Sequence, residues 1–210
     1  MAENKILYTT IKNEAVAEFE EKRSLFIGHA KPVKTEEEAA EFIKEKKREF
    51  SDATHNVFGY IMKNGIIARY SDDGEPQGTA GMPVLDTIRK SGVSDACVVV
   101  TRYFGGILLG AGGLVRAYSH GAKLALESAE IITYEQYTVM RVRCNYSDYQ
   151  KVQPMFFKAG AVIDDTDFGE SVTVTLAVKD EVVQSLSEKI RESTSGRSIA
   201  EIVGQRFDYR

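Results

Sequence analysis

The sequence is poor in cysteine, contains no tryptophan and has no long hydrophobic run. Its two cysteines, Cys97 and Cys144, lie far apart in apolar segments. They form neither a CxxC pair nor a Cys/His cluster with the spacing of a zinc site. The sequence therefore predicts two reduced, buried thiols.

Membrane and secretion signals are also missing from the sequence. No apolar run approaches the roughly 18 residues that a membrane span requires. The first sixteen residues show no positively charged region followed by an apolar one. Together with the reduced thiols, these absences predict a cytoplasmic protein without a membrane partner.

Neither sign of charge dominates the chain. The net charge is −4 over 210 residues, and neither part of the chain is basic when it is divided after Glu135. Nucleic-acid-binding proteins often carry a strong positive excess. A role in nucleic-acid binding must therefore depend on a local patch of basic residues.

The first part of the chain alternates strand-like and helical patterns. Two strand-like runs flank a polar turn at residues 20–23, which predicts a hairpin. Thr35 and Glu38 form a capping box at the start of a helix. Asn64-Gly65 separates two apolar runs and predicts a second hairpin, and Pro83 lies in the first turn of a second helix.

A β-branched run, "ACVVVTRYF", predicts a strand that is buried on both faces. A glycine-rich loop follows it and leads into a helix that we expect to begin near Gly113 or Leu114. These elements form a first α/β domain, which we assign to residues 1–133.

The last part of the chain has the pattern βαββαβ, with helices that we expect to start at Ser147 and at Lys179-Asp180. This order is typical of a ferredoxin-like sandwich. We assign residues 134–210 to a second domain, so that the predicted fold class of the whole chain is α+β.

The segment "RYFGGILLGAGGLVRAYS" combines a strand end, a glycine-rich loop and a helix start. Free backbone N–H groups and the helix dipole make such a junction favourable for anions. The spacing fits neither a P-loop nor a dinucleotide fingerprint. We expect two arginine side chains to converge there on phosphate or carboxylate oxygens. The predicted anion or nucleic-acid site comprises Arg102, Gly105, Gly106, Gly110, Gly112, Gly113, Arg116 and His120.

Two further groups of residues have both a functional and a structural interpretation. Asp72, Asp73 and Glu75 form an acidic turn that could hold Mg²⁺ or the basic groups of a partner, or that only follows turn chemistry. The stripe of Arg116 and His120 along the helix is either solvated or faces a ligand. Lys22, Arg23 and His55 are possible accessory residues, or ordinary solvent contacts. No serine lies in a nucleophile elbow, so no catalytic residue is assigned.

Four segments together resemble one known family. "EKRSLFIGHA", "THNVFGY", "YSDDGEPQGTAGMP" and "VVTRYFGGILLGAGGLVRAYS" are similar to the signature of the IMPACT family in its bacterial, YigZ-type form. The resemblance implies a first domain like the second domain of ribosomal protein S5 and a ferredoxin-like second domain. It also implies a link to translation.

Three functional hypotheses remain. The first is a non-enzymatic, translation-linked regulatory protein that binds RNA, the ribosome or a translation-associated protein through phosphate contacts. The second is an enzyme for a small phosphorylated or carboxylated ligand, with Mg²⁺ at the acidic turn and His55 or His120 as acid or base. The third is a module for protein interaction alone. The sequence names no ligand, no other cofactor and no oligomeric state.

Overall fold

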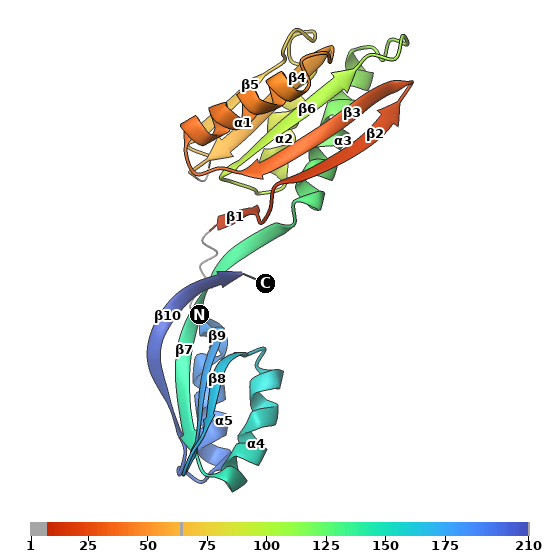
Figure 1. The fold of residues 1–210 in the computed structure, drawn as a ribbon. Helices are drawn as coiled ribbons and strands as arrows, with labels where there is room; N and C mark the ends of the chain where they lie inside the picture. Colours follow the sequence, from red (N-terminus) through yellow and green to blue (C-terminus); the bar gives the residue numbers. More distant parts are fainter. Residues whose placement is uncertain (1–7, 64, 210) are drawn as a thin grey trace. The chain divides into compact units, whose positions relative to one another are not determined.

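The computed structural model describes residues 8–63 and 65–209, so Asn64 of the predicted turn lies outside the described residues. The chain divides into two compact units, Tyr8–Thr133 and the part that begins at Tyr134 (Figure 1). Each unit has its own hydrophobic core and is described by itself.

The first unit is built on an antiparallel sheet whose central strand is β6 (Ala96–Tyr103). The strands follow the order β2 (Ala15–Glu21), β3 (Ser24–Pro32), β6, β4 (His55–Met62) and β5 (Ile67–Ser71). Every residue of β6 is buried except its last, Tyr103. The predicted strand buried on both faces is therefore confirmed.

Helices cover both faces of this sheet (Figure 1). The helices α2 (Gly81–Lys90) and α3 (Ala111–Ser128) lie side by side on one face, over the larger core. The helix α1 (Glu36–Glu49) covers the other face with Phe42 and Ile43. The α3 backbone approaches β3 so closely that a Cβ on Gly28 would lie 2.4 Å from the carbonyl oxygen of Gly121.

Local chemistry explains the predicted turns and the first cap. The β2–β3 hairpin turns at Lys22 and Arg23, whose φ angles are 48° and 65°; positive φ at both turn residues matches the twist of a hairpin. Thr35 accepts a hydrogen bond from the Glu38 N–H at 3.2 Å. The predicted hairpin and helix cap are both confirmed.

The start of α3 differs from the prediction. The helix begins at Ala111, ahead of the expected Gly113 or Leu114. Gly110 precedes it with φ 73° and ψ 164°, a conformation that is open to glycine and strained for other residues. Gly112 and Gly113 are poor helix formers, so propensity alone placed the start too late.

The strand β7 (Ile131–Cys144) follows α3 and begins in the first unit. There it pairs with β1 (Tyr8–Ile11), and the hydroxyl groups of Thr9 and Thr133 are hydrogen-bonded at 3.0 Å. The rest of β7 belongs to the second unit.

The second unit has the order β7, α4 (Tyr146–Lys158), β8 (Val162–Phe168), β9 (Val172–Lys179), α5 (Asp180–Ser193) and β10 (Ile199–Tyr209). Its strands lie in the order β10, β7, β9, β8, and each pair is antiparallel. The helices α4 and α5 bury one face of the sheet. This is the predicted ferredoxin-like arrangement, and the α+β class is confirmed.

The cap of α4 is Asn145, where Ser147 was expected. The Asn145 side chain accepts from the Asp148 N–H at 2.8 Å, and asparagine is among the best capping residues. Asp148 also receives two hydrogen bonds from the Arg197 guanidinium, at 2.8 and 2.9 Å, which hold the pKa of Asp148 at about 2. Within the described residues, no helix combines the length and apolar character of a membrane span.

Candidate functional site

A buried ion pair joins the acidic turn to the central strand. The Arg102 guanidinium donates from Nη1 to Oε1 of Glu75 at 2.6 Å, and the two side chains are only 6% and 4% exposed. A buried pair of this kind loses much of its Coulombic gain to desolvation. Its presence therefore calls for further partners that stabilise both charges.

Those partners come from three other elements of the first unit. The Tyr118 hydroxyl on α3 donates to the same Glu75 oxygen at 2.8 Å, and burial beside that carboxylate raises the pKa of Tyr118 strongly. Nη2 of Arg102 donates to Oγ of Ser24 on β3 at 3.4 Å. The guanidinium also lies over the rings of Phe26 and Phe104, 5.5 and 5.4 Å from their centroids.

His55, at the start of β4, completes this group. Its Nδ1 lies 2.8 Å from the backbone carbonyl oxygen of Asp73. Because a carbonyl oxygen can only accept, Nδ1 carries the proton and Nε2 presents a lone pair in the neutral ring. Nε2 faces Glu75, 3.7 Å from Oε1. We call His55, Glu75, Arg102 and Tyr118 the floor network.

A cavity of about 350 Å³ lies against the floor network. Its lining is mostly apolar, and His55, Glu75 and Arg102 supply charged or polar groups. The apolar walls come from the loop between β6 and α3 and from the α3 N-terminus, with Phe104, Leu108, Leu109, Gly110, Ala111 and Leu114. Phe104 and Leu108 remain 44% and 82% exposed. The volume is in the range of small-ligand pockets.

The other two carboxylates of the acidic turn have structural partners. Asp72 accepts hydrogen bonds from the N–H groups of Gly78, Ala80 and Gly81, at 2.9, 3.1 and 2.8 Å. It therefore closes the loop and caps the start of α2, where Ala80 has no capping side chain of its own. The turn interpretation describes Asp72 well.

Asp73 ties the turn to β4 and α1. Its carboxylate accepts from the Asn56 N–H at 2.6 Å and from Nζ of Lys47 at 2.5 Å. The φ angle of Asp73 is 46°, a left-handed turn conformation. The three acidic side chains thus point to different partners, and the described residues contain no group of three or more metal-ligating side chains. The arrangement does not fit the suggested Mg²⁺ site.

A prediction follows for Asp72. Replacing Asp72 with alanine leaves three backbone N–H groups without their acceptor and removes the cap of α2. We expect the free energy of unfolding to fall by about 2 kcal/mol, measured by urea denaturation. Asp52→Ala is the control, because Asp52 is exposed and accepts from one side chain, that of Tyr103, at 2.8 Å. Stabilisation of the wild type, but not of Asp72→Ala, by millimolar Mg²⁺ would instead favour a metal role.

The N-terminus of α3 keeps free hydrogen-bond donors. The first helical amide with a backbone acceptor is that of Leu114, which donates to Gly110 at 2.9 Å. Among the described residues no acceptor contacts the N–H groups of Ala111, Gly112 and Gly113, and Gly110 offers no capping side chain. Such an uncapped helix start favours an anion.

Arg116 stands beside these donors, in the second turn of the helix. It is exposed, and its Nη1 would lie 3.6 Å from a Cβ built on Gly112. Within the described part of the chain it forms no ion pair. Arg116 therefore adds an unneutralised guanidinium to the free N–H groups.

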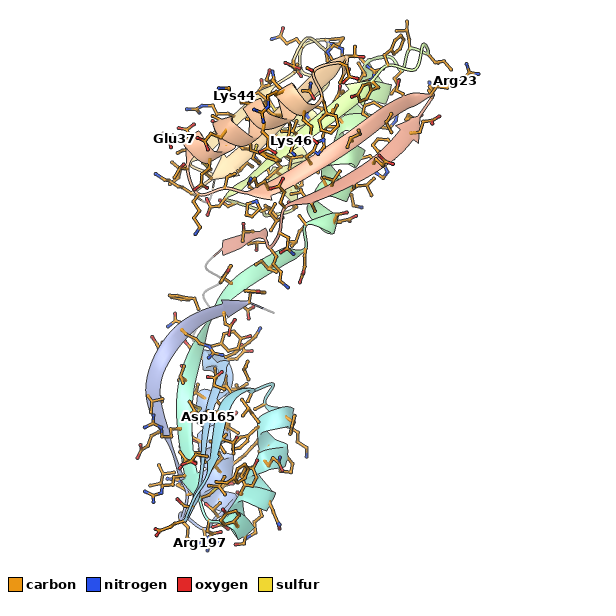
Figure 2. The ribbon with its side chains drawn as sticks, viewed as in Figure 1. Arg23, Glu37, Lys44, Lys46, Asp165 and Arg197 are labelled. Carbon is orange, nitrogen blue, oxygen red and sulfur yellow. The ribbon has the colours of Figure 1, made fainter. Side chains whose placement is uncertain are left out.

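Arg116 also lines a second cavity, of about 440 Å³, together with Lys22, Leu109 and His120. Glu20 and Glu21 contribute to the same lining, so its charge is mixed. His120 packs edge-on against Phe19, with ring centroids 4.7 Å apart. His120 is thus exposed and packed against Phe19, a contact that neither interpretation of the stripe included. Arg23 lies at the tip of the β2–β3 hairpin (Figure 2).

The expected convergence of two arginines needs correction. Arg102 is buried against Glu75 and lines the first cavity, whereas Arg116 is exposed and lines the second. The reason is electrostatic: a guanidinium that points into the core needs a carboxylate close by, and Glu75 supplies it. Of the predicted anion site, Arg116 and the helix start keep donors that no described residue accepts from.

The remaining glycines shape the loop. A Cβ on Gly105 would lie 1.9 Å from the carbonyl oxygen of Arg23, so only glycine lets the loop rest on the β2–β3 turn. Gly106 has φ 82° and lies in open space. Gly113 approaches Leu109, with 2.9 Å between its ideal Cβ position and the Leu109 Cβ. Gly105, Gly106 and Gly113 therefore serve the path of the backbone.

Two residues of the site escaped the sequence analysis. Tyr118 lies two positions after Arg116, on the buried side of α3, and its only signal was that position on the apolar helix face. Phe104 ends the run that predicted a buried strand, so the sequence pattern assigned it to that strand, whereas β6 ends at Tyr103. Its exposure depends on the bend that begins at Gly106, which no local pattern specifies.

Comparison with known proteins places this arrangement in a family. The profile of the Impact N-terminal domain matches residues 22–126, which include the floor network and the α3 N-terminus. The chain belongs to the IMPACT family. The profile of a domain of unknown function, DUF1949, matches residues 142–197 of the second unit.

Relatives match over most of the chain. The IMPACT family member YvyE of Bacillus subtilis is 36% identical over 192 residues, covering 91% of this chain and 88% of its own. The IMPACT family member YigZ of Escherichia coli is 32% identical over 178 residues, covering 83% and 87%. A crystal structure titled only as that of a hypothetical protein aligns with a TM-score of 0.58 at 28% identity, covering 94% of this chain and 97% of that one. The resemblance to the bacterial members is confirmed.

Proposed function

We propose that this IMPACT family member is a translation-linked, non-enzymatic binding protein that holds RNA phosphates, free or on the ribosome, at the N-terminus of α3. The observation that carries the proposal is the uncapped helix start beside Arg116. Three backbone N–H groups and one guanidinium there have no acceptor among the described residues. Phosphate oxygens are the acceptors that such a junction favours.

Neighbouring charges support an extended contact with a phosphate backbone. Lys22 shares a cavity with Arg116, and Arg23 follows it at the hairpin tip. Both are exposed and form no ion pair with a described residue. Glu20 and Glu21 lie close to them, so the patch is local, as the net charge of −4 requires. Cytoplasmic localisation belongs to the same proposal.

The first test measures the salt dependence of binding. Arg116→Ala is expected to weaken binding to a single-stranded RNA oligonucleotide and to purified bacterial ribosomes. If Arg116 contacts one phosphate, the slope of log K against log salt should fall in magnitude by about 0.7 for the single strand. Fluorescence anisotropy with the labelled oligonucleotide, between low and physiological salt, measures both effects.

Lys44→Ala is the matched control. Lys44 is an exposed cation on α1, on the opposite face of the sheet, and forms no ion pair with a described residue (Figure 2). Its replacement should leave the affinity and the slope unchanged. Equal behaviour of Arg116→Ala and the wild type in both assays would refute phosphate binding at α3.

An interaction with protein alone is the competing outcome. Ile107 and Leu108 are 40% and 82% exposed on the loop beside the site. Ribosome binding that depends on these side chains but not on salt or on Arg116 would favour a protein partner, because apolar contacts carry little salt dependence.

A further inference from the structure

The cavity over the floor network holds hydrogen-bonding groups that the fold leaves unused. Oε1 of Glu75 accepts from both Arg102 and Tyr118, whereas Oε2 accepts from no described residue. Nε2 of His55 presents a lone pair 3.7 Å from Oε1 of the same carboxylate. Both residues line the cavity, so a ligand that donates hydrogen bonds can reach these two acceptors.

A third unused group is a donor. Nε of Arg102 has no hydrogen-bond partner among the described residues, but it is fully enclosed, so a ligand in the cavity does not reach it. The charges of Arg102 and Glu75 cancel. The floor network therefore offers hydrogen bonds to a ligand but carries no net charge that would attract an ion. A neutral ligand with adjacent donors therefore suits the floor better than an ion does.

The walls restrict the shape of such a ligand. Phe104 and Leu108 stand exposed at the mouth, and Leu109 and Leu114 continue the apolar surface inward. A flat, aromatic molecule can cover Phe104 by stacking, a contact worth about 1–3 kcal/mol for a nucleobase. At the other end the cavity reaches Gly110 and Ala111, where the free amides of α3 begin.

We propose that the cavity binds a guanine nucleotide, with the base over the floor network and its phosphate at the α3 N-terminus. Guanine presents one acceptor, O6, next to two donors, N1–H and the N2 amino group. The two adjacent donors complement the two free acceptors on Glu75 and His55. Adenine, cytosine and uracil each lack the adjacent pair of donors. The placement of the phosphate rests on the proposed function above.

The test uses GMP, AMP, CMP and UMP as probes in isothermal titration calorimetry with the full chain. GMP should bind about tenfold more tightly than each of the other three, a ratio typical of a bidentate contact to a base edge. IMP, which lacks the N2 amino group, should fall between GMP and AMP. Equal affinities for all five nucleotides, or no binding of GMP at millimolar concentration, would overturn the proposal.

Phe104→Ala tests the position of the base without touching the buried ion pair's hydrogen bonds. We expect GMP affinity to fall about tenfold through loss of stacking. Phe157→Ala is the matched control, because Phe157 is 71% exposed on α4 of the second unit; its GMP affinity should equal that of the wild type. An unchanged affinity in Phe104→Ala would place the base elsewhere.

A single-stranded pentamer with one central guanine separates the two sources of the base. Tighter binding of the pentamer than of GMP, lost when the guanine is replaced by adenine, indicates a base within RNA. Tighter binding of GMP indicates a free nucleotide. If Arg116→Ala leaves ribosome binding intact while GMP is still selected, the phosphate proposal fails and the base site stands. If RNA binds with the predicted salt slope but without preference for guanine, the base site fails alone.

Discussion

Replacing Glu75 with alanine is expected to cost about 3–5 kcal/mol in the free energy of unfolding. The substitution leaves the Arg102 guanidinium, 5% exposed, without its carboxylate, and an uncompensated buried charge of this kind has a cost in that range. It also removes the acceptor of the Tyr118 hydroxyl. Urea denaturation followed by circular dichroism measures the change.

The control for Glu75 is an ion pair of similar length at the surface. Asp86 and Arg89 are 2.7 Å apart on α2, and their side chains are 41% and 57% exposed. Asp86→Ala should cost no more than about 0.5 kcal/mol, because solvent screens exposed pairs. A Glu75→Ala loss as small as this one would show that Arg102 finds water or another acceptor.

The double variant Glu75→Leu with Arg102→Met gives a second check. Removal of both charges leaves apolar side chains in place of the pair, and replacements of this type are often neutral or stabilising. The double variant should therefore be more stable than Glu75→Ala. If the two are equally unstable, the cost lies in packing at Tyr118 and not in the unpaired charge.

The second large effect is expected at Gly105. A Cβ at this position would lie 1.9 Å from the backbone carbonyl oxygen of Arg23 and 2.0 Å from its carbonyl carbon. Since a backbone group cannot rotate away, the loop or the β2–β3 turn must move. Gly105→Ala should lower the free energy of unfolding by about 3 kcal/mol, at the upper end of the usual cost of overpacking. Thermal and urea unfolding measure the loss.

Gly112→Ala is the control that separates this steric clash from the general effect of replacing glycine with alanine. Gly112 lies in the first turn of α3, and its nearest new contact would be the mobile end of Arg116, at 3.6 Å. Alanine is a better helix former by about 1 kcal/mol, so this variant should be as stable as the wild type or more stable. Comparable losses in Gly105→Ala and Gly112→Ala would rule out the contact with Arg23 as the cause.

Much of the fold could be predicted from short-range patterns. The Thr35 cap, the β2–β3 turn and the buried strand β6 each depend on neighbours within a few residues, and the sequence displays those neighbours. The start of α3 could not be placed correctly, because it depends on the conformation of Gly110 and not on helix propensity.

The candidate site was harder to predict, because its decisive contacts are long-range. The pairing of Arg102 with Glu75 spans 27 residues and that of Tyr118 with Glu75 spans 43. The local composition shows that arginine, glycine and acidic residues lie in one region of the chain. It does not predict which of the charged side chains is buried in the core. The sequence therefore indicated the region of the candidate site and left open whether Arg102 or Arg116 faces solvent.

The floor network also has a consequence for the motions of the protein. Its members Glu75, Arg102, Tyr118 and His55 come from the acidic turn, β6, α3 and β4, and Ser24, which accepts from Arg102, lies on β3. Because their contacts converge on one carboxylate and one guanidinium, each of these segments that opens breaks a contact with one of these two groups. Amide hydrogen exchange in β6 and in the buried turns of α3 should consequently proceed through one common opening, whereas the amides of Ala111, Gly112 and Gly113 exchange independently and fast. A bound phosphate would slow only the latter group, which makes exchange at these three amides a local reporter of occupancy.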